Sequence, residues 1–180
     1  MRLAFAFALL LAAPPVEARA QVAEPEGYRT ENYRAPVPAT LAGARVADTA
    51  GVERLWKDNG AAFIDVLPRP PKPANLPADT VWRDKPRRDI PGSLWLPDTG
   101  YGRLPEAVSA YLSRGLGKAS NGDKSRLLVF YCLRDCWMSW NAAKRAISLG
   151  YRNVIWYPDG TDGWAAAGLR LEDRTPEPRG

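Results

Sequence analysis

Short apolar runs recur along residues 45–157, and segments with helical spacing separate them. The runs are continuous rather than alternating in polarity, which is typical of parallel strands buried on both faces. Each run therefore predicts a strand. The predicted strands are 45–47, 62–66, 93–96, 126–131 and 154–157.

Three helices are expected between these strands. Asp48 or Thr49 can cap the first helix, Pro105 suits the first turn of the second, and Gly150 follows the third. The predicted helices are 48–57, 105–114 and 139–149, with a loop at 115–124 and a turn at 159–163. Strands that alternate with helices predict one α/β domain, with about five parallel strands and helices on both sheet faces.

The first residues have the pattern of a secretory signal peptide. A basic start precedes the apolar stretch 3–13, and Ala18-Arg19-Ala20 is a small-x-small cleavage site. We expect cleavage after Ala20, a periplasmic protein and no membrane span, because eleven apolar residues are too few to cross a bilayer, which takes about 20. The expected parts are a signal peptide (1–20), an extended arm (21–44), a domain (45–172) and a flexible tail (173–180).

A proline-rich basic insertion interrupts the domain at residues 67–88. Six prolines among its 22 residues make regular structure unlikely to form there, and its basic residues dominate the formal charge of +5. The insertion is interpreted either as a docking segment for an acidic partner or an anion, or as a solvated linker. The charge pattern lacks a basic helix with interleaved aromatic residues, so no nucleic-acid partner is expected.

The chain contains no histidine, which removes the commonest general base and metal ligand. Self-contained histidine triads, zinc hydrolase sites and c-type haem attachment are therefore excluded.

The only two cysteines, Cys132 and Cys136, lie where the fourth predicted strand passes into a helix. The carboxyl ends of parallel strands are where open α/β sheets bind ligands. The cysteines are therefore the candidate catalytic residues, with a loop around them that contacts the substrate. The candidate loop residues are Leu133, Arg134, Asp135, Trp137, Met138 and Ser139.

Two other interpretations of the cysteine pair remain open. An exported cysteine pair often forms a permanent disulfide, which would fit a non-catalytic binding or accessory module. Cys132, Cys136 and Met138 also offer three soft sulfur ligands, which would suit Cu(I) as an alternative cofactor. Without that alternative, no cofactor is expected.

The chain resembles a rhodanese-like domain over roughly residues 45–170. The matching segments, in order, are 63–66, 89–93, the strand into Cys132, 142–143, 149–151, 154 and 159–168. The run from Cys132 to Arg145, with Trp137 after the second cysteine, also resembles a narrower group. These are exported proteins with a cysteine–cysteine–tryptophan (CXXCW) motif, associated with alcohol oxidation dependent on pyrroloquinoline quinone (PQQ).

The resemblance implies a nucleophile at Cys132, held in a loop whose backbone amides point inward around a persulfide or an anion. Cys136 would be the resolving thiol, and Asp65 and Trp164 would have structural roles near the site. The activity implied is sulfur transfer or thiol–disulfide chemistry on a small sulfur-containing or thiol substrate. The implied partner is a periplasmic quinoprotein dehydrogenase system.

Overall fold

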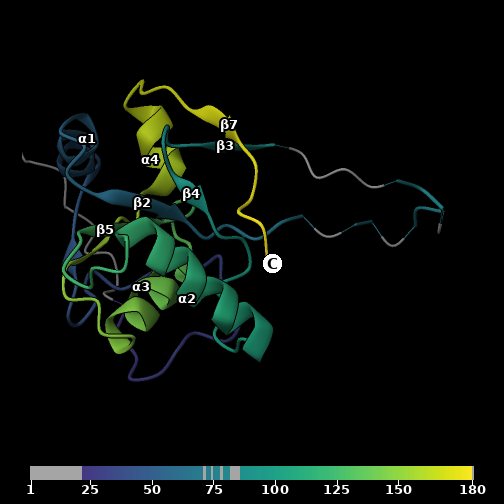
Figure 1. The fold of residues 1–180 in the computed structure, drawn as a ribbon, viewed down its shortest axis with the longest axis horizontal. Coiled ribbons are helices and arrows are strands. Elements are labelled where there is room, and N and C mark those ends of the chain that lie inside the picture. The colour runs from purple at the N-terminus through teal and green to yellow at the C-terminus, as the bar shows by residue number, and fades with distance from the viewer. Residues whose placement is uncertain (1–21, 71, 74, 78, 82–85, 180) are drawn as a thin grey trace, which may run out of the picture.

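The structure, a computed structural model, describes residues 22–70, 72–73, 75–77, 79–81 and 86–179. The expected signal peptide lies outside these residues. A five-stranded parallel sheet forms the centre, in the order β1-β6-β5-β2-β4. Its strands are β1 (Arg45–Val46), β2 (Ala62–Asp65), β4 (Leu94–Trp95), β5 (Leu128–Tyr131) and β6 (Val154–Trp156). Figure 1 shows the sheet between its helices.

Helices cover both faces of the sheet, as predicted. In the described residues they are α1 (Thr49–Lys57), α2 (Glu106–Ser120), α3 (Trp137–Ser148) and α4 (Gly160–Ala166). Leu116 of α2 and Trp140 of α3 pack into one apolar cluster, whereas Val52 of α1 and Trp164 of α4 pack into another. The predicted α/β fold with about five parallel strands is confirmed.

Two predicted boundaries are wrong. Helix α2 continues through the predicted loop to Ser120. Gly115 does not end the helix. It allows close packing on Leu96, because a Cβ at this position would lie 2.6 Å from the Leu96 side chain. The helix stops at Asn121, which adopts a left-handed conformation (φ 51°). The predicted turn at 159–163 instead contains most of the short helix α4.

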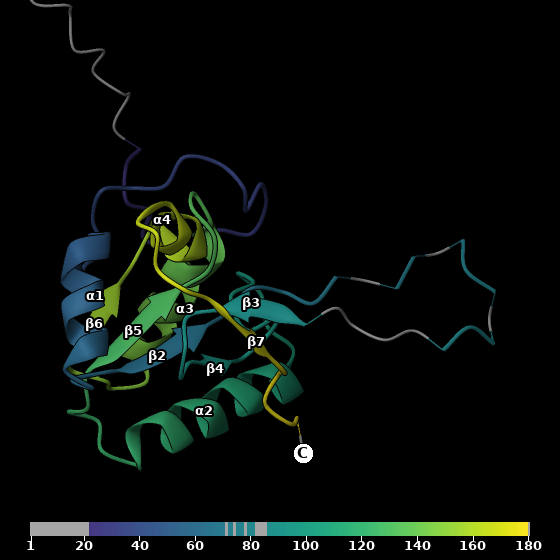
Figure 2. The same cartoon turned by 90° about the horizontal axis from the view of Figure 1, so that it is seen from above.

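A second, two-stranded antiparallel sheet contains the last two residues of the proline-rich insertion. Its strands are β3 (Arg87–Asp89) and β7 (Glu172–Arg174), both rich in charged residues. The prediction that 67–88 lacks regular structure is therefore wrong for its last two residues. The described residues between β2 and β3 extend far from the body (Figure 2).

The N-terminal arm, residues 22–44, packs along the domain instead of standing free. Leu41 is 2 % exposed and belongs to the same cluster as α3. Three side chains of α3 bind arm carbonyls: Trp137 Nε1 donates to Pro36 O (3.1 Å), Trp140 Nε1 to Thr40 O (3.1 Å) and Lys144 Nζ to Pro25 O (3.0 Å).

Asn141 of α3 also forms hydrogen bonds with the arm. This side chain is fully buried, accepts the Arg29 amide at Oδ1 (2.9 Å) and donates from Nδ2 to Arg29 O (2.8 Å) and Gly100 O (2.9 Å). The arm therefore forms part of the packed domain over α3.

Candidate functional site

The two cysteines form a disulfide at the carboxyl edge of the sheet. Cys132 directly follows β5 and Cys136 is the N-terminal cap of α3, with their Cα atoms 6.2 Å apart. Cys132 is fully buried and Cys136 is 2 % exposed. The resemblance implied that the first sulfur lies among inward-pointing backbone amides, with room for a persulfide or an anion. In this oxidised state that expectation is wrong, because the bridge and its packing enclose both sulfurs.

The N-terminal arm covers the second cysteine. Arg34 and Cys136 form an isolated antiparallel β-bridge, and the Trp137 amide donates to Tyr33 O (2.9 Å). That amide lies in the first turn of α3, where backbone N–H groups lack partners within the helix. The arm therefore satisfies one of these donors and lies directly against the loop.

The second half of the predicted loop is packed rather than available to a substrate. Ser139 is fully buried, donates to Cys136 O (2.9 Å) and accepts from Trp156 Nε1 (3.0 Å). Met138 is 6 % exposed and lies against Gly100, and Trp137 packs under the arm. These side chains hold the loop in place.

The first half of the loop forms the exposed rim. Leu133 is half-buried, Arg134 is exposed, and Asp135 adopts a left-handed conformation (φ 52°). The Arg134 amide donates to Asp162 Oδ2 (3.0 Å), so this N–H points towards α4 rather than into the loop. The Arg134 side chain lies 3.4 Å from Asp159 Oδ1.

A buried ion pair between Asp65 and Arg87 lies next to the cysteine loop. Asp65 Oδ2 accepts from Arg87 Nε (2.6 Å), and Asp65 Oδ1 accepts the Leu67 amide (2.9 Å). Asp65 is fully buried, and the Arg87 side chain is 10 % exposed. Burial raises the pKa of Asp65, while Arg87 and the backbone N–H groups act against this shift. Arg87 is therefore not available to dock an acidic partner, which is the role that the docking hypothesis gives to the basic residues of the insertion.

The same arginine reaches the cysteine loop. The Cys132 carbonyl accepts the Thr161 amide (3.0 Å) and lies 3.4 Å from both Arg87 Nη2 and Thr161 Oγ1. Arg87 Nη2 also donates to Thr161 Oγ1 (3.0 Å). Asp65 is thus linked to the cysteine loop through Arg87.

A second buried acid, Asp89, lies beside this ion pair. Burial raises its pKa to about 7, and the nearby Asp65 carboxylate adds to the shift. The Tyr131 hydroxyl contacts both Asp89 Oδ1 and Ser93 Oγ, whereas the Ser93 hydroxyl donates to Ile90 O (2.7 Å). One tyrosine proton cannot serve two acceptors, so a proton on Asp89 completes the hydrogen bonding.

This arrangement predicts the effect of Asp89→Asn on the pH dependence of stability. Because the pKa is raised in the folded protein, the wild type loses stability as the pH rises from about 4 to 7, by on the order of 4 kcal/mol. The variant should lack this decline. Urea unfolding at pH 4.5 and pH 7.5 measures it, and an equal decline in both proteins would contradict a protonated Asp89.

Trp164 belongs to a different apolar cluster from the two cysteines. Its ring packs on the opposite sheet face against Trp56, and its Nε1 donates to Arg170 O (2.9 Å). Sequence reasoning assigned no role at the site to Thr161, Asp89, Tyr131 or Arg34. Only the position of Tyr131 just before Cys132 signals its proximity.

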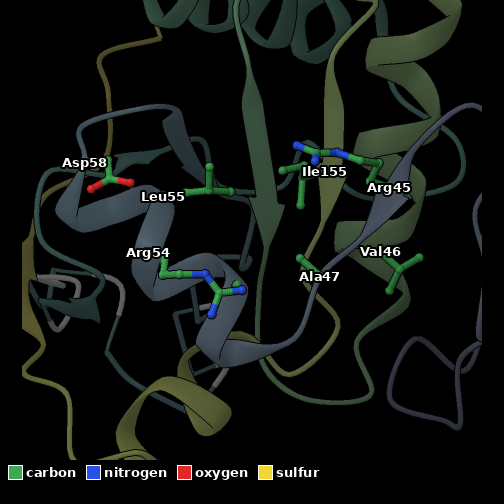
Figure 3. Close-up of a pocket in the computed structure, with 8 residues that line it drawn as sticks. Arg45, Val46, Ala47, Arg54, Leu55, Asp58 and Ile155 are labelled. Atoms are coloured by element: carbon green, nitrogen blue, oxygen red, sulfur yellow. The ribbon is translucent and has the colours of Figure 1, made fainter.

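Two surface depressions differ in their relation to the loop. One, of about 390 Å³, is lined by Arg34, Ala35, Pro36, Arg134, Asp135 and Asp162. The other, of about 340 Å³, lies between β1 and α1 with Arg45 and Asp58 on its wall (Figure 3), and it contains no loop residue.

In the described chain, no group of three acidic, cysteine or histidine residues is arranged to hold a metal ion. The alternative Cu(I) set would require the bridge to be reduced first, since only thiolates ligate in that way. No helix among the described residues is long and apolar enough to span a membrane.

The domain is an α/β fold with a parallel sheet, and a cysteine loop joins its central strand to the next helix. This arrangement defines the class of protein. The chain belongs to the rhodanese-like domain family, whose model matches residues 52–167. No curated protein matches the chain.

Several solved structures are similar to it. The polysulfide-sulfur transferase of Wolinella succinogenes is 17 % identical (TM-score 0.46), over 74 % of this chain and 82 % of that one. The human single-domain sulfurtransferase is 22 % identical (TM-score 0.41), over 68 % and 96 %. The thiosulfate sulfurtransferase of Pseudomonas aeruginosa is 18 % identical (TM-score 0.47), over 74 % and 21 %.

Proposed function

We propose that this protein performs sulfur transfer coupled to thiol–disulfide chemistry, with Cys132 as the nucleophile and Cys136 as the resolving thiol. The observation that carries the proposal is the bridge between them, at the carboxyl edge of the sheet. The reduced pair would lie at the positive end of α3, where a thiolate is stabilised.

The proposed cycle begins with the reduced pair. The Cys132 thiolate attacks the outer sulfur of a donor such as thiosulfate, and sulfite leaves as the S–S bond breaks. Cys132 then carries a persulfide. The Cys136 thiolate attacks Cys132 Sγ, which forms the bridge and releases hydrosulfide. Two equivalents of an external thiol reduce the bridge and are themselves joined as a disulfide.

The proposal also includes the setting of this chemistry. The N-terminal pattern supports export to the periplasm, and the CXXCW-like run from Cys132 to Trp137 supports a role beside a PQQ-dependent alcohol dehydrogenase system. The motif here has three residues between its cysteines. Deleting the gene should lower quinoprotein alcohol dehydrogenase activity in periplasmic extracts, and unchanged activity would contradict this role.

The experiment for the chemistry uses the reduced full chain, thiosulfate and mass spectrometry. Cys136→Ser should release sulfite and retain one added sulfur atom, because no thiol resolves the persulfide. Cys132→Ser should do neither. The wild type should release sulfite and hydrosulfide and return to the bridged form.

A second candidate function is a non-catalytic binding module with a permanent disulfide. The near-complete burial of both sulfurs favours it. In that case the bridge would resist mild thiols in the folded protein, and neither single-serine variant would accumulate a persulfide.

A further inference from the structure

The depression beside the cysteine loop joins two parts of the chain that are far apart in sequence. It is lined by Arg34, Ala35 and Pro36 of the arm together with Arg134, Asp135 and Asp162. Its volume of about 390 Å³ is in the range of small-molecule sites. Because Arg34 pairs with Cys136, the depression lies at the Cys136 end of the bridge.

The charges on its walls balance. Two arginines and two aspartates line it, so the depression favours neither a simple anion nor a simple cation. Arg134 is already engaged by Asp159, and Asp162 accepts the Arg134 amide.

Arg34 and Asp135 differ from these residues. Within the described residues, neither side chain makes an ion pair, although both line the same depression. One cation and one anion that line the same depression therefore remain open to a ligand. A ligand that carries both a carboxylate and an ammonium group satisfies both.

We propose that Arg34 and Asp135 recognise a zwitterionic amino-acid thiol, of the class of free cysteine, as the reductant of the bridge. Arg34 binds its carboxylate and Asp135 binds its ammonium group. This inference rests on the proposed thiol–disulfide chemistry and names the thiol that this site accepts. Arg34 lies outside the family match at 52–167, so this recognition is a feature added by the arm.

The chemical step is a thiol–disulfide exchange. The ligand thiolate attacks Cys136 Sγ, the bridge breaks, and the electron pair leaves on Cys132 Sγ as a thiolate. A mixed disulfide then joins the ligand to Cys136. A second thiol attacks that mixed disulfide, which releases the oxidised ligand and leaves both cysteines reduced. Because Cys136 is 2 % exposed, the attack requires a local opening beside the depression in which Arg34 and Asp135 stay bound to the ligand.

The test compares four reductants on the bridged full chain: cysteine, 3-mercaptopropionate, cysteamine and 2-mercaptoethanol. Each rate is divided by the wild-type rate with the same thiol, so differences in intrinsic thiol reactivity cancel. Arg34→Gln should slow the two carboxylate-bearing thiols about two- to fivefold, and Asp135→Asn should slow the two ammonium-bearing thiols to the same extent. Cysteine should be slowed by both variants, and 2-mercaptoethanol by neither.

Arg45→Gln and Asp58→Asn are matched controls, since these charges line the depression away from the loop. They should leave all four rates unchanged. Equal slowing of all four thiols by Arg34→Gln would overturn the recognition and leave the proposed chemistry intact. A wild-type bridge that none of the four thiols reduces would overturn the proposed chemistry and this inference with it.

Discussion

Arg87→Met is expected to destabilise the protein by about 3–5 kcal/mol, because it leaves the fully buried Asp65 carboxylate without its charge partner. The Cys132 carbonyl also loses a contact, and Thr161 loses the donor that orients its hydroxyl. Reduction of the bridge by 2-mercaptoethanol should therefore be faster in the variant. Urea unfolding and reduction kinetics measure the two effects.

Arg88→Met is the matched control for this prediction. Arg88 is the next residue, but its side chain is 63 % exposed and its contact with Asp173 lies at the surface, so its loss should cost less than about 1 kcal/mol. The double variant Asp65→Asn/Arg87→Met should recover much of the lost stability, since no buried charge remains unpaired. Equal destabilisation by Arg87→Met and Arg88→Met would contradict the importance of the buried pair.

Gly160→Ala is expected to destabilise by about 2–4 kcal/mol and to displace the cysteine loop. Gly160 has φ 53°, and an alanine Cβ would lie 2.7 Å from the Cys132 carbonyl carbon. The left-handed conformation alone costs about 1–2 kcal/mol, and the clash with backbone cannot be relieved by a rotamer change. Thermal unfolding and the rate of persulfide formation on reduced protein measure the outcome.

Gly168→Ala separates the two causes. Gly168 also has a positive φ (74°), but no atom lies within 4 Å of the position its Cβ would take. This variant should lose only the conformational part of the stability and retain the wild-type rate of persulfide formation. If the two alanine variants behave alike, close packing of α4 on the Cys132 peptide has no functional effect.

The central strands β2, β5 and β6 were predictable because they are largely buried, which makes their apolar runs continuous. Residues 128–131 are all buried, and the run leads directly to Cys132. The end of α2 was not predictable. A glycine such as Gly115 is typical of a helix end, whereas here it allows close packing against Leu96. The β3–β7 pair was missed because its strands carry charges instead of apolar residues.

The site was predictable only where its residues are local in sequence. Cys132 and Cys136 lie four positions apart at one strand–helix junction, so their proximity follows from the pattern. The contact of Arg34 with Cys136 and that of Arg87 with Cys132 depend on how distant segments pack. No periodicity or composition in residues 22–44 indicates which helix that segment covers.

The arm over α3 has a consequence for the order in which the chain acquires its structure during synthesis. The hydrogen bond between Thr40 and Trp140 joins residues 100 positions apart, so the segment that the ribosome makes early has no docking surface until most of the domain exists. Contacts of such long sequence range form slowly. A nascent chain therefore exposes Leu41 until α3 has emerged, and a chaperone that holds this segment would raise the yield of native protein.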